Sequence, residues 1–373
     1  MIILAIETSC DETAISVVEC SGNFSRPKFN ILSNIISSQV KIHAEWGGVV
    51  PNLAKREHIK NLPIILKKAL KKAKIGQEKI DLIAVTVGPG LEPALWTGIN
   101  FATDLSKVWG KPLVGVNHME GHLLSVLLKE KSNLKSQISK IIKFPAVALL
   151  VSGGHTELVL IKDWLKYKII GQTRDDAAGE AFDKVAKMLG LPYPGGPQIA
   201  KLADNHQSPV ISNQIKLPRP MINSKDYDFS FSGLKTAVLY LLRDLGAKKS
   251  GFRRIPRYGR PKENQFLCDD LKTAICREFQ QAVIDVLVSK TIKAAEQYKV
   301  KTVILGGGVA ANKELRKQLK QSIKKNNTLN LILPEIKFTG DNAVMIAIAA
   351  YFHALKKEKT NWKILKANGN LTL

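Results

Sequence analysis

The fold is decided by residues 2–18, which read IILAIETSCDETAISVV. Apolar side chains run without interruption from 2 to 6, polar side chains fill 7–13, and apolar side chains predominate again from 14 to 18. Short apolar runs bounded by polar turn residues are typical of buried strands. The stretch therefore predicts a β-hairpin whose turn is rich in carboxylates and hydroxyls.

A similar unit occurs at residues 146–161. An apolar run, AVALLV at 146–151, leads into the turn SGGH at 152–155, and a threonine opens a second apolar run. In the first hairpin a threonine likewise precedes the return strand. Recurrence at so long a distance predicts a duplicated domain and not a solenoid.

Between and after the two hairpins, apolar strands alternate with amphipathic helices. The pattern predicts strands at 82–87, 113–116 and 302–305, and helices at 59–73, 94–108, 176–189, 271–298 and 343–356. Such alternation indicates an α/β fold with mainly parallel sheets and right-handed crossovers. We expect a first lobe at residues 1–143. The second lobe, at 144–373, would include a basic insertion at about 246–261 and a C-terminal helix at about 341–357.

The composition is that of a globular protein. Of 373 residues, 45% are hydrophobic and 24% charged, which excludes global disorder because enough apolar surface is present for a core. The longest apolar runs, 343–352 and 144–151, fall short of the ~18 residues of a membrane span. The apolar run 1–6 is too short for a signal peptide. Four cysteines without a C-x-x-C pair suit a reducing compartment.

The charge balance is strongly positive, with 56 Lys and Arg against 32 Asp and Glu and a formal net charge of +24. One explanation of this excess is an RNA partner. The other is a solvated lysine-rich surface, which a biased genome composition also produces. Positive side chains gather without periodicity in residues 246–261. That segment is either a plain surface loop or an RNA-contacting loop, in which arginines bind phosphates and Phe252 and Tyr258 stack on bases.

Two histidines, His118 and His122, follow the predicted strand 113–116 directly. Residues at i and i+4 lie about 5–6 Å apart on one helix face, which suits two imidazole ligands on one metal ion. The alternative is a pair of histidines with ordinary hydrogen-bond partners. In a peptidase H-E-x-x-H site the Glu follows the first His, but Glu120 stands two residues on, about 200° around the helix. Asp341, before the last predicted helix, is either an N-cap or an oxygen ligand.

Three glycine-rich turns follow predicted strands, at 88–90, 152–155 and 306–308. Glycine lets backbone N–H groups approach a phosphate closely, although each turn alone is also explained as a plain turn. Asp183, in an acidic helix entry, either complements the helix dipole or accepts hydrogen bonds from a ribose. Together with the paired hairpins, the turns resemble the sugar kinase, Hsp70 and actin superfamily, whose two related lobes clasp a nucleotide.

Ten motifs in order resemble the family of tRNA N6-adenosine threonylcarbamoyltransferases, the TsaD family, once described as glycoproteases. They are ETSCDET (7–13), GGVVP (47–51), GPGL (88–91), HMEGH (118–122), VSGGHT (151–156), DAAGEAFDK (176–184), YPGGP (193–197), FSFSGLKT (229–236), GGGVAAN (306–312) and GDN (340–342). The resemblance covers residue 2 to about residue 355. The first two motifs are closest to the bacterial and organellar branch. Because the similarity begins at residue 2 and leaves no room for a transit peptide, we expect a cytoplasmic protein of a bacterium.

The resemblance implies an acyltransferase. It would move the threonylcarbamoyl group from threonylcarbamoyl-adenylate to N6 of the adenosine at position 37 of tRNAs that read codons beginning with A, releasing AMP. It implies that His118, His122 and Asp341 hold one divalent metal ion, iron or alternatively zinc. The implied adenylate-binding residues are Val151, Ser152, Gly153, Gly154, His155, Asp183, Gly196 and Asn312. The implied partners are tRNA, a smaller paralogous subunit (TsaB-like) and a P-loop ATPase subunit (TsaE-like).

Two carboxylates of the first hairpin, Asp11 and Glu12, are candidate bases or positioning groups for the adenine amine. The backbone of the Gly153-Gly154 turn is a candidate for stabilising negative charge that develops in the reaction. Rival functions are a nucleotide-binding metalloprotease, a non-catalytic scaffold and a kinase of the same superfamily. The position of Glu120 argues against the first, and the retained His, Asp and glycine motifs argue against the second. The sequence at 7–9, which replaces a D-x-G-T-T phosphate hairpin, argues against the third.

Overall fold

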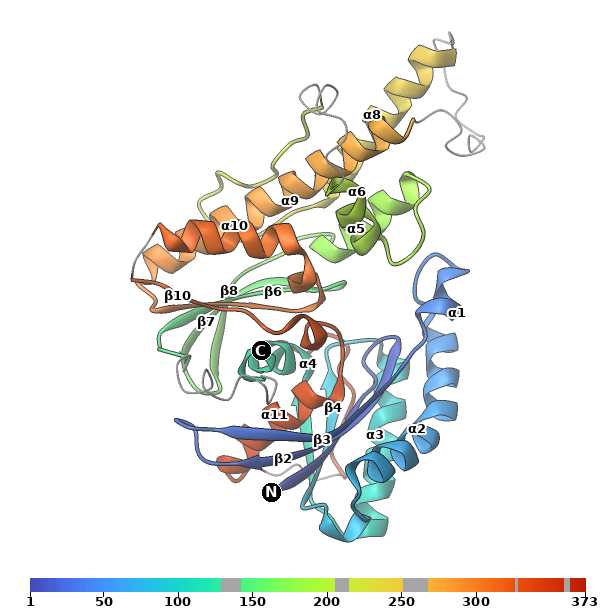
Figure 1. The fold of residues 1–373 in the computed structure, drawn as a ribbon, viewed down its shortest axis with the longest axis vertical. Helices are drawn as coiled ribbons and strands as arrows, with labels where there is room; N and C mark the ends of the chain where they lie inside the picture. The colour runs from blue at the N-terminus through green and yellow to red at the C-terminus, as the bar shows by residue number, and fades with distance from the viewer. Residues whose placement is uncertain (129–141, 205–214, 251–267, 326–327, 359–362) are drawn as a thin grey trace.

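The computed structural model describes residues 1–128, 142–204, 215–250, 268–325, 328–358 and 363–373. It contains two five-stranded sheets, with helices between them and helices on both outer faces (Figure 1). The mixed α/β class predicted from the sequence is therefore confirmed.

The first sheet has the strand order β3-β2-β1-β4-β5. Its strands are β1 (Ile2–Glu7), β2 (Glu12–Ser21), β3 (Lys28–Ser38), β4 (Leu82–Gly88) and β5 (Leu113–Asn117). The first three form an antiparallel meander, and β4 and β5 add beside β1 in parallel. The predicted hairpin is confirmed, with Ile6 opposite Ile15.

The second sheet has the strand order β10-β9-β6-β7-β8. Its strands are β6 (Ala146–Val151), β7 (Thr156–Asp163), β8 (Lys166–Gln172), β9 (Thr302–Gly306) and β10 (Asn330–Ile332). Here β6, β7 and β8 form the antiparallel meander, and β9 and β10 add beside β6 in parallel. The two sheets thus share one order of strands and one pattern of strand directions.

The expectation of mainly parallel sheets is wrong. Each sheet pairs its strands in two antiparallel and two parallel ladders, because β3 and β8 extend the hairpins into meanders. Both are edge strands whose residues are mostly half-buried or exposed. They therefore lack the continuous apolar run that marks a strand buried on both faces.

The helices predicted at 59–73, 94–108, 176–189, 271–298 and 343–356 all occur, and the structure contains further helices besides them. The helices of the described residues are α1 (Val40–Ala44), α2 (Pro51–Ala73), α3 (Glu92–Trp109), α4 (His118–Leu124), α5 (Ala178–Met188), α6 (Gly195–Ala203), α8 (Ser232–Ser250), α9 (Asp269–Gln297), α10 (Lys313–Lys324) and α11 (Ala343–Leu355). The largest difference among the predicted helices is in α2, which begins at Pro51 and not at 59. Proline is favoured at the first helical position, because a backbone N–H there has no partner within the helix and its absence costs no hydrogen bond.

Three clusters of buried apolar side chains fill the spaces between the layers of the fold. One lies under α2 and α3 on the outer face of the first sheet, and one lies under α5, α6, α9 and α10 on the outer face of the second. The third fills the space between the sheets, around α4 and α11 (Figure 1). This central layer carries the residues of greatest interest for function.

The last helix, α11, packs on the first sheet, whereas the sequence led us to expect it in the second lobe. Every residue of α11 from Ala343 to Phe352 is buried, and its neighbours include β1, β2, β5 and α4. The helix predicted at about 341–357 in the second lobe therefore rests on the first sheet, which its apolar surface on all sides allows. The boundary at 143/144 stays a prediction.

Two other expectations concern the surface. The predicted basic insertion overlaps the end of α8 at 246–250, and residues 251–261 lie outside the described residues. Within the described ranges, no helix is both long and apolar enough to span a membrane.

Candidate functional site

Two histidines and an aspartate meet between the sheets. The imidazole rings of His118 and His122, on α4, have centroids 4.6 Å apart and lie nearly perpendicular. Oδ1 of Asp341, just before α11, lies 3.1 Å from Nε2 of His122 and 3.5 Å from Nε2 of His118. One candidate ligand atom of each residue lies within 4.8 Å of the other two. We call these three residues the His-His-Asp triad.

The donor set of the triad suits a divalent metal ion. Two imidazole nitrogens and one carboxylate oxygen are typical ligands of zinc and of non-haem iron. Nδ1 of His122 is buried and has no hydrogen-bond partner among the described residues. Burial raises the pKa of Asp341, but the facing imidazoles outweigh it and hold that pKa well below its usual range. The carboxyl group is therefore ionised, as metal binding requires.

The end of β5 fixes where α4 begins. Asn117 caps the helix, since its Oδ1 accepts hydrogen bonds from the N–H groups of Met119 (2.8 Å) and Glu120 (3.3 Å). Its Nδ2 donates to the carbonyl oxygen of Thr372 at 3.1 Å. All residues of α4 are buried. Because so short a helix is unstable alone, tertiary packing and this cap must hold the histidines in place.

A buried carboxylate, Glu7, orients His118. Its Oε2 lies 3.1 Å from Nδ1 of His118 and accepts a hydrogen bond from Oγ1 of Thr86 at 2.6 Å. Its Oε1 accepts from the N–H of Ser9, whose Oγ lies 3.1 Å from the same imidazole nitrogen. With Nδ1 engaged, Nε2 faces Asp341, an arrangement typical of metal-binding histidines. The motifs did not mark Glu7 as a site residue, although a carboxylate that ends an apolar strand was a visible signal.

Glu120 faces away from the triad, as its helical position predicts. Its Oε1 accepts a hydrogen bond from the Tyr167 hydroxyl at 2.8 Å, and its Oε2 lies 2.7 Å from Nε2 of His353. These contacts tie α4 to β8 of the second sheet and to α11. The carboxylate is not placed to act as the base of a metalloprotease.

The turn between β6 and β7 is tight and open to solvent. The N–H of Ser152 donates to the carbonyl oxygen of His155 (2.8 Å), and the N–H of His155 donates to Oγ of Ser152 (3.1 Å). Gly153 and Gly154 are exposed, and a Cβ atom at either position would meet nothing within 4 Å. Burial and the two triad imidazoles lower the pKa of His155 to about 4, so its ring is neutral. Val151, the first of the predicted residues in this segment, is buried at the end of β6.

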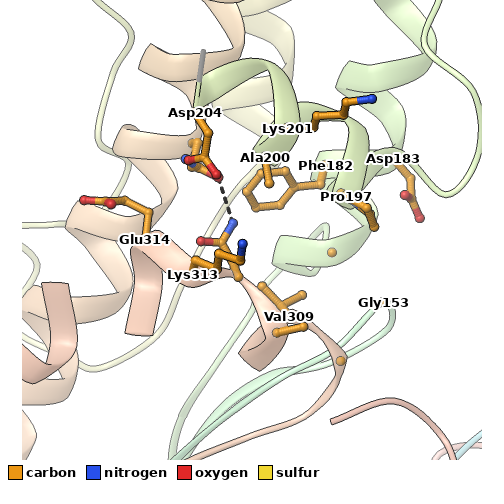
Figure 2. A pocket seen from close by; sticks show the side chains of 16 residues that line it. Gly153, Phe182, Asp183, Pro197, Ala200, Lys201, Asp204, Val309, Lys313 and Glu314 are labelled. Carbon is orange, nitrogen blue, oxygen red and sulfur yellow. Dashed lines mark hydrogen bonds between the residues drawn. The ribbon is translucent and has the colours of Figure 1, made fainter. Parts of the chain in front are cut away.

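A cavity of about 460 Å³ opens beside this turn, lined by residues of α5, α6, α9 and α10 (Figure 2). Four predicted adenylate-binding residues line it: Gly153, Asp183, Gly196 and Asn312. Figure 2 shows the Phe182 ring turned into the cavity, with Gly153 at one end and Asp204 at the opposite end. Apolar walls with a few polar groups are typical of small-molecule sites.

Protein contacts shape the polar wall of this cavity. Asp183 accepts a hydrogen bond at 2.7 Å from the N–H of Gly195, the first residue of α6. Burial raises the pKa of Asp183, and the N–H groups of Gly195 and Gly196 partly offset that effect. Asn312 caps α10 through Oδ1 and donates from Nδ2 to Gln280 at 2.8 Å. Their position at the cavity is observed, and their role toward a ligand stays a prediction.

The candidate bases lie at the turn of the first hairpin. Asp11 is buried, and its Oδ2 has no hydrogen-bond partner within the described part of the chain. Glu12 accepts from Oγ of Ser38 at 3.1 Å, and burial together with the charges of Asp341 and Asp11 raises its pKa to about 9. Burial and the charges of Asp11 and Asp183 raise the pKa of Tyr193 as well. The first hairpin thus faces both the triad and the helices of the cavity, and its role as a base stays a prediction.

Comparison with known proteins gives one consistent result. The family model for TsaD, tRNA N6-adenosine threonylcarbamoyltransferase, matches residues 30–348. A protein of that name from Thermosipho africanus is 44% identical over 373 residues, covering 100% of both chains. Others are 47% identical over 351 residues in Thermosipho melanesiensis (94% of each chain) and 44% identical over 349 residues in Bacillus subtilis (94% of this chain, 89% of that one).

Among solved structures, YeaZ from Pseudomonas aeruginosa matches 45% of this chain and 68% of its own at 12% identity, with a TM-score of 0.28. The assignment rests on the family model and on the sequence relatives and not on this likeness. On that evidence, the chain belongs to the TsaD family of tRNA N6-adenosine threonylcarbamoyltransferases.

Proposed function

We propose that this chain transfers the threonylcarbamoyl group of threonylcarbamoyl-adenylate to N6 of the adenosine at position 37 of tRNAs that read codons beginning with A, with release of AMP. Membership of the TsaD family makes it a tRNA-modifying transferase. The observation that carries the detailed reaction is the His-His-Asp triad. It lies between the carboxylate-rich turn of the first hairpin and the glycine turn 152–155 of the second.

One divalent ion would be held by Nε2 of His118, an imidazole nitrogen of His122 and the carboxylate of Asp341. The family resemblance favours iron(II), with zinc as the alternative, and the donor set suits either ion. When bound, the ion supplies a Lewis acid that polarises a carbonyl or phosphoryl oxygen. Glu7 would keep the His118 ring in the orientation that binding needs, through its contact with Nδ1.

The adenylate would occupy the cavity beside the second hairpin. Its apolar walls at Phe182, Pro197 and Val309 suit the adenine ring, and Asp183 suits a ribose hydroxyl. The exposed backbone of Gly153 and Gly154 suits the phosphate and the negative charge that develops as AMP leaves. This placement accords with a two-lobed fold of the actin, Hsp70 and sugar-kinase kind, which the matching strand orders of the two sheets support.

The acceptor adenosine would approach from the side of the first hairpin. Its N6 attacks the carbamoyl carbon, the bond from that carbon to the phosphate oxygen breaks, and the N6 proton passes to a carboxylate. Asp11 offers a buried oxygen without a partner among the described residues. Glu12, whose pKa burial raises to about 9, would position the amine by hydrogen bonding.

We infer that the reaction takes place in the cytoplasm with protein partners. These are a smaller paralogous TsaB-like subunit and a P-loop ATPase of the TsaE kind. A metalloprotease is disfavoured because Tyr167 and His353 hold Glu120 away from the triad. A nucleotide-binding scaffold without catalysis is the remaining alternative.

Reconstitution tests the reaction. The purified chain would be combined with iron(II), the partner subunits of a related bacterium, synthetic threonylcarbamoyl-adenylate and unmodified tRNA. Mass spectrometry of nucleosides would score the modified adenosine. We expect product with tRNAs that read codons beginning with A and none with a tRNA whose position 37 is guanosine. Absence of product, with partners that support a related enzyme in parallel, would contradict the proposal and favour the scaffold.

A further inference from the structure

The loop between α1 and α2 presents an aromatic side chain to solvent. Trp46 directly precedes Gly47 and Gly48 of the GGVVP motif and is 65% exposed. Tryptophan is enriched at binding interfaces, because its ring offers a large apolar face and its N–H can still reach a polar partner. Nothing in the proposed chemistry uses this residue or the motif beside it.

Hydrogen bonds fix the loop to the turn of the first hairpin. The N–H of Gln39 donates to the carbonyl oxygen of Asp11 at 2.9 Å, and Oε1 of Gln39 lies 3.0 Å from Nε2 of His43. The carbonyl oxygen of His43 then accepts the N–H of Trp46 at 3.0 Å. Gln39 and His43 are both buried. Three hydrogen bonds thus connect the backbone of Asp11, through Gln39 and His43, to the backbone of Trp46.

The same loop reaches the helices of the cavity. A Cβ atom at Gly47 would lie 3.2 Å from Nζ of Lys187, which belongs to α5. Lys187 lies one helical turn beyond Asp183, which lines the cavity. Figure 1 shows α1 extending from the first sheet toward α5 and α6. Gly47, next in sequence to Trp46, therefore lies where the half of the molecule built on the first sheet approaches α5, whose Asp183 lines the cavity.

The charge of the segments that adjoin Trp46 and Gly47 favours a nucleic acid. Four exposed cations belong to the neighbouring segments: Lys41, Lys55, Arg56 and Lys187. Glu45 and Glu57 are the acidic residues nearest in sequence, so cations predominate. Single-stranded RNA is bound by aromatic side chains that stack on unpaired bases, with cations beside them for the phosphates. An anticodon loop offers unpaired bases on both sides of its modified adenosine.

We propose that Trp46 stacks on an unpaired base of the tRNA anticodon loop, next to the acceptor adenosine. The indole replaces the stacking partner that this base loses when the adenosine turns into the site. The inference rests on the proposed function, which makes tRNA the acceptor, and it adds how the loop is held. Trp46 is in this sense a substrate-binding residue, because it would contact the tRNA away from the reacting atoms.

Binding of a short RNA tests the proposal. The full chain with its partner subunits would be titrated into a fluorescent anticodon stem-loop, and anisotropy would be recorded. We expect Trp46→Ala to weaken binding about 10-fold and Trp46→Tyr to restore most of it, because a phenol ring still stacks. Val108→Ala removes a side chain that is 80% exposed at the end of α3, away from the loop, and should change nothing. In the transfer reaction, Trp46→Ala should raise KM for tRNA about 10-fold and change kcat much less.

Wild-type RNA affinity in Trp46→Ala would overturn the proposal. A variant that keeps its RNA affinity but loses the paralogous subunit, measured by sedimentation, would identify the loop as a protein-docking surface instead. The RNA-binding measurement does not depend on catalysis. A wild-type protein that binds the stem-loop through Trp46 but makes no modified adenosine therefore refutes the proposed function and leaves this inference standing.

Discussion

The two hairpins share one topology and differ in the chemistry of their turns. In the first, the side chains of Glu7, Ser9 and Asp11 are buried and the turn is packed from behind, since a Cβ atom at Gly90 would lie 2.5 Å from the carbonyl oxygen of Ser9. In the second, Gly153 and Gly154 face solvent, and a Cβ atom at either position would have no neighbour within 4 Å. The first turn therefore supplies fixed side chains, and the second supplies accessible backbone. The same order of strands thus carries two turns of different chemistry.

The largest effect should come from the first turn. Asp11→Asn removes the proposed proton acceptor and keeps the shape of the side chain. We expect the transfer rate to fall about 100-fold, within the usual range for loss of a general base, while the bound metal and the adenylate affinity are retained. Rapid-quench measurement of the modified adenosine would show this. A normal rate in Asp11→Asn and also in Glu12→Gln would exclude both carboxyls as bases.

A second effect should come from the residue that orients His118. Glu7→Gln weakens the hydrogen bond to Nδ1, and loss of such a partner lowers metal affinity about 10–100-fold. Metal titration followed by calorimetry would measure this. Glu120→Gln is the matched control, since Glu120 is a buried carboxylate of α4 itself whose side chain faces away from the triad. Equal losses in both variants would mean that the effect comes from weakened packing of α4.

Two glycine substitutions, one at each turn, test the difference between the turns directly. Gly90→Ala places a Cβ against the first turn, at a φ of +155°, and should lower the free energy of unfolding by about 2–3 kcal/mol. Gly154→Ala meets no neighbour and should leave stability within about 0.5 kcal/mol, yet weaken adenylate binding several-fold. Urea unfolding and AMP titration would measure both. Equal free energies of unfolding in the two variants would contradict the proposed difference between the two turns.

The smallest effect concerns the contact between His353 of α11 and Glu120 of α4. Burial lowers the pKa of His353, but Glu120 and Glu358 outweigh it and raise the pKa from 6.5 to about 9. Because the pKa of His353 is higher in the folded than in the unfolded chain, its protonated ring stabilises the fold. This stabilisation is fully present below pH 6.5 and is lost as the pH rises toward 9. We expect a loss on the order of 2 kcal/mol in this window. Urea unfolding of the wild type and of His353→Gln would isolate it, since only the wild type should show this component.

The sequence predicted the elements whose signal is local. The bounds of β6 match the apolar run 146–151, and the i,i+4 spacing placed His118 and His122 on one face of α4. Asp341 remained either a cap or a ligand, because its contact with His122 joins positions 219 residues apart.

What the sequence left out depends on distant contacts. The role of Glu7 requires Thr86 and His118, which meet only when β1 lies between β2 and β4. The lining of the cavity includes Gln280 of α9, which is distant in sequence from the glycine turn at 152–155. The edge strands β3 and β8 were missed because half-buried strands carry a weak pattern.

The central claim is that the His-His-Asp triad holds a metal ion that the transfer needs. The most direct test measures, on one preparation, the metal content by mass spectrometry and the rate of threonylcarbamoyl transfer. We predict one ion per chain in the wild type and in His353→Gln. In His122→Ala and Asp341→Ala we predict loss of the ion together with a fall in the rate of at least about 100-fold. Transfer at the wild-type rate by either triad variant without bound metal would contradict the claim.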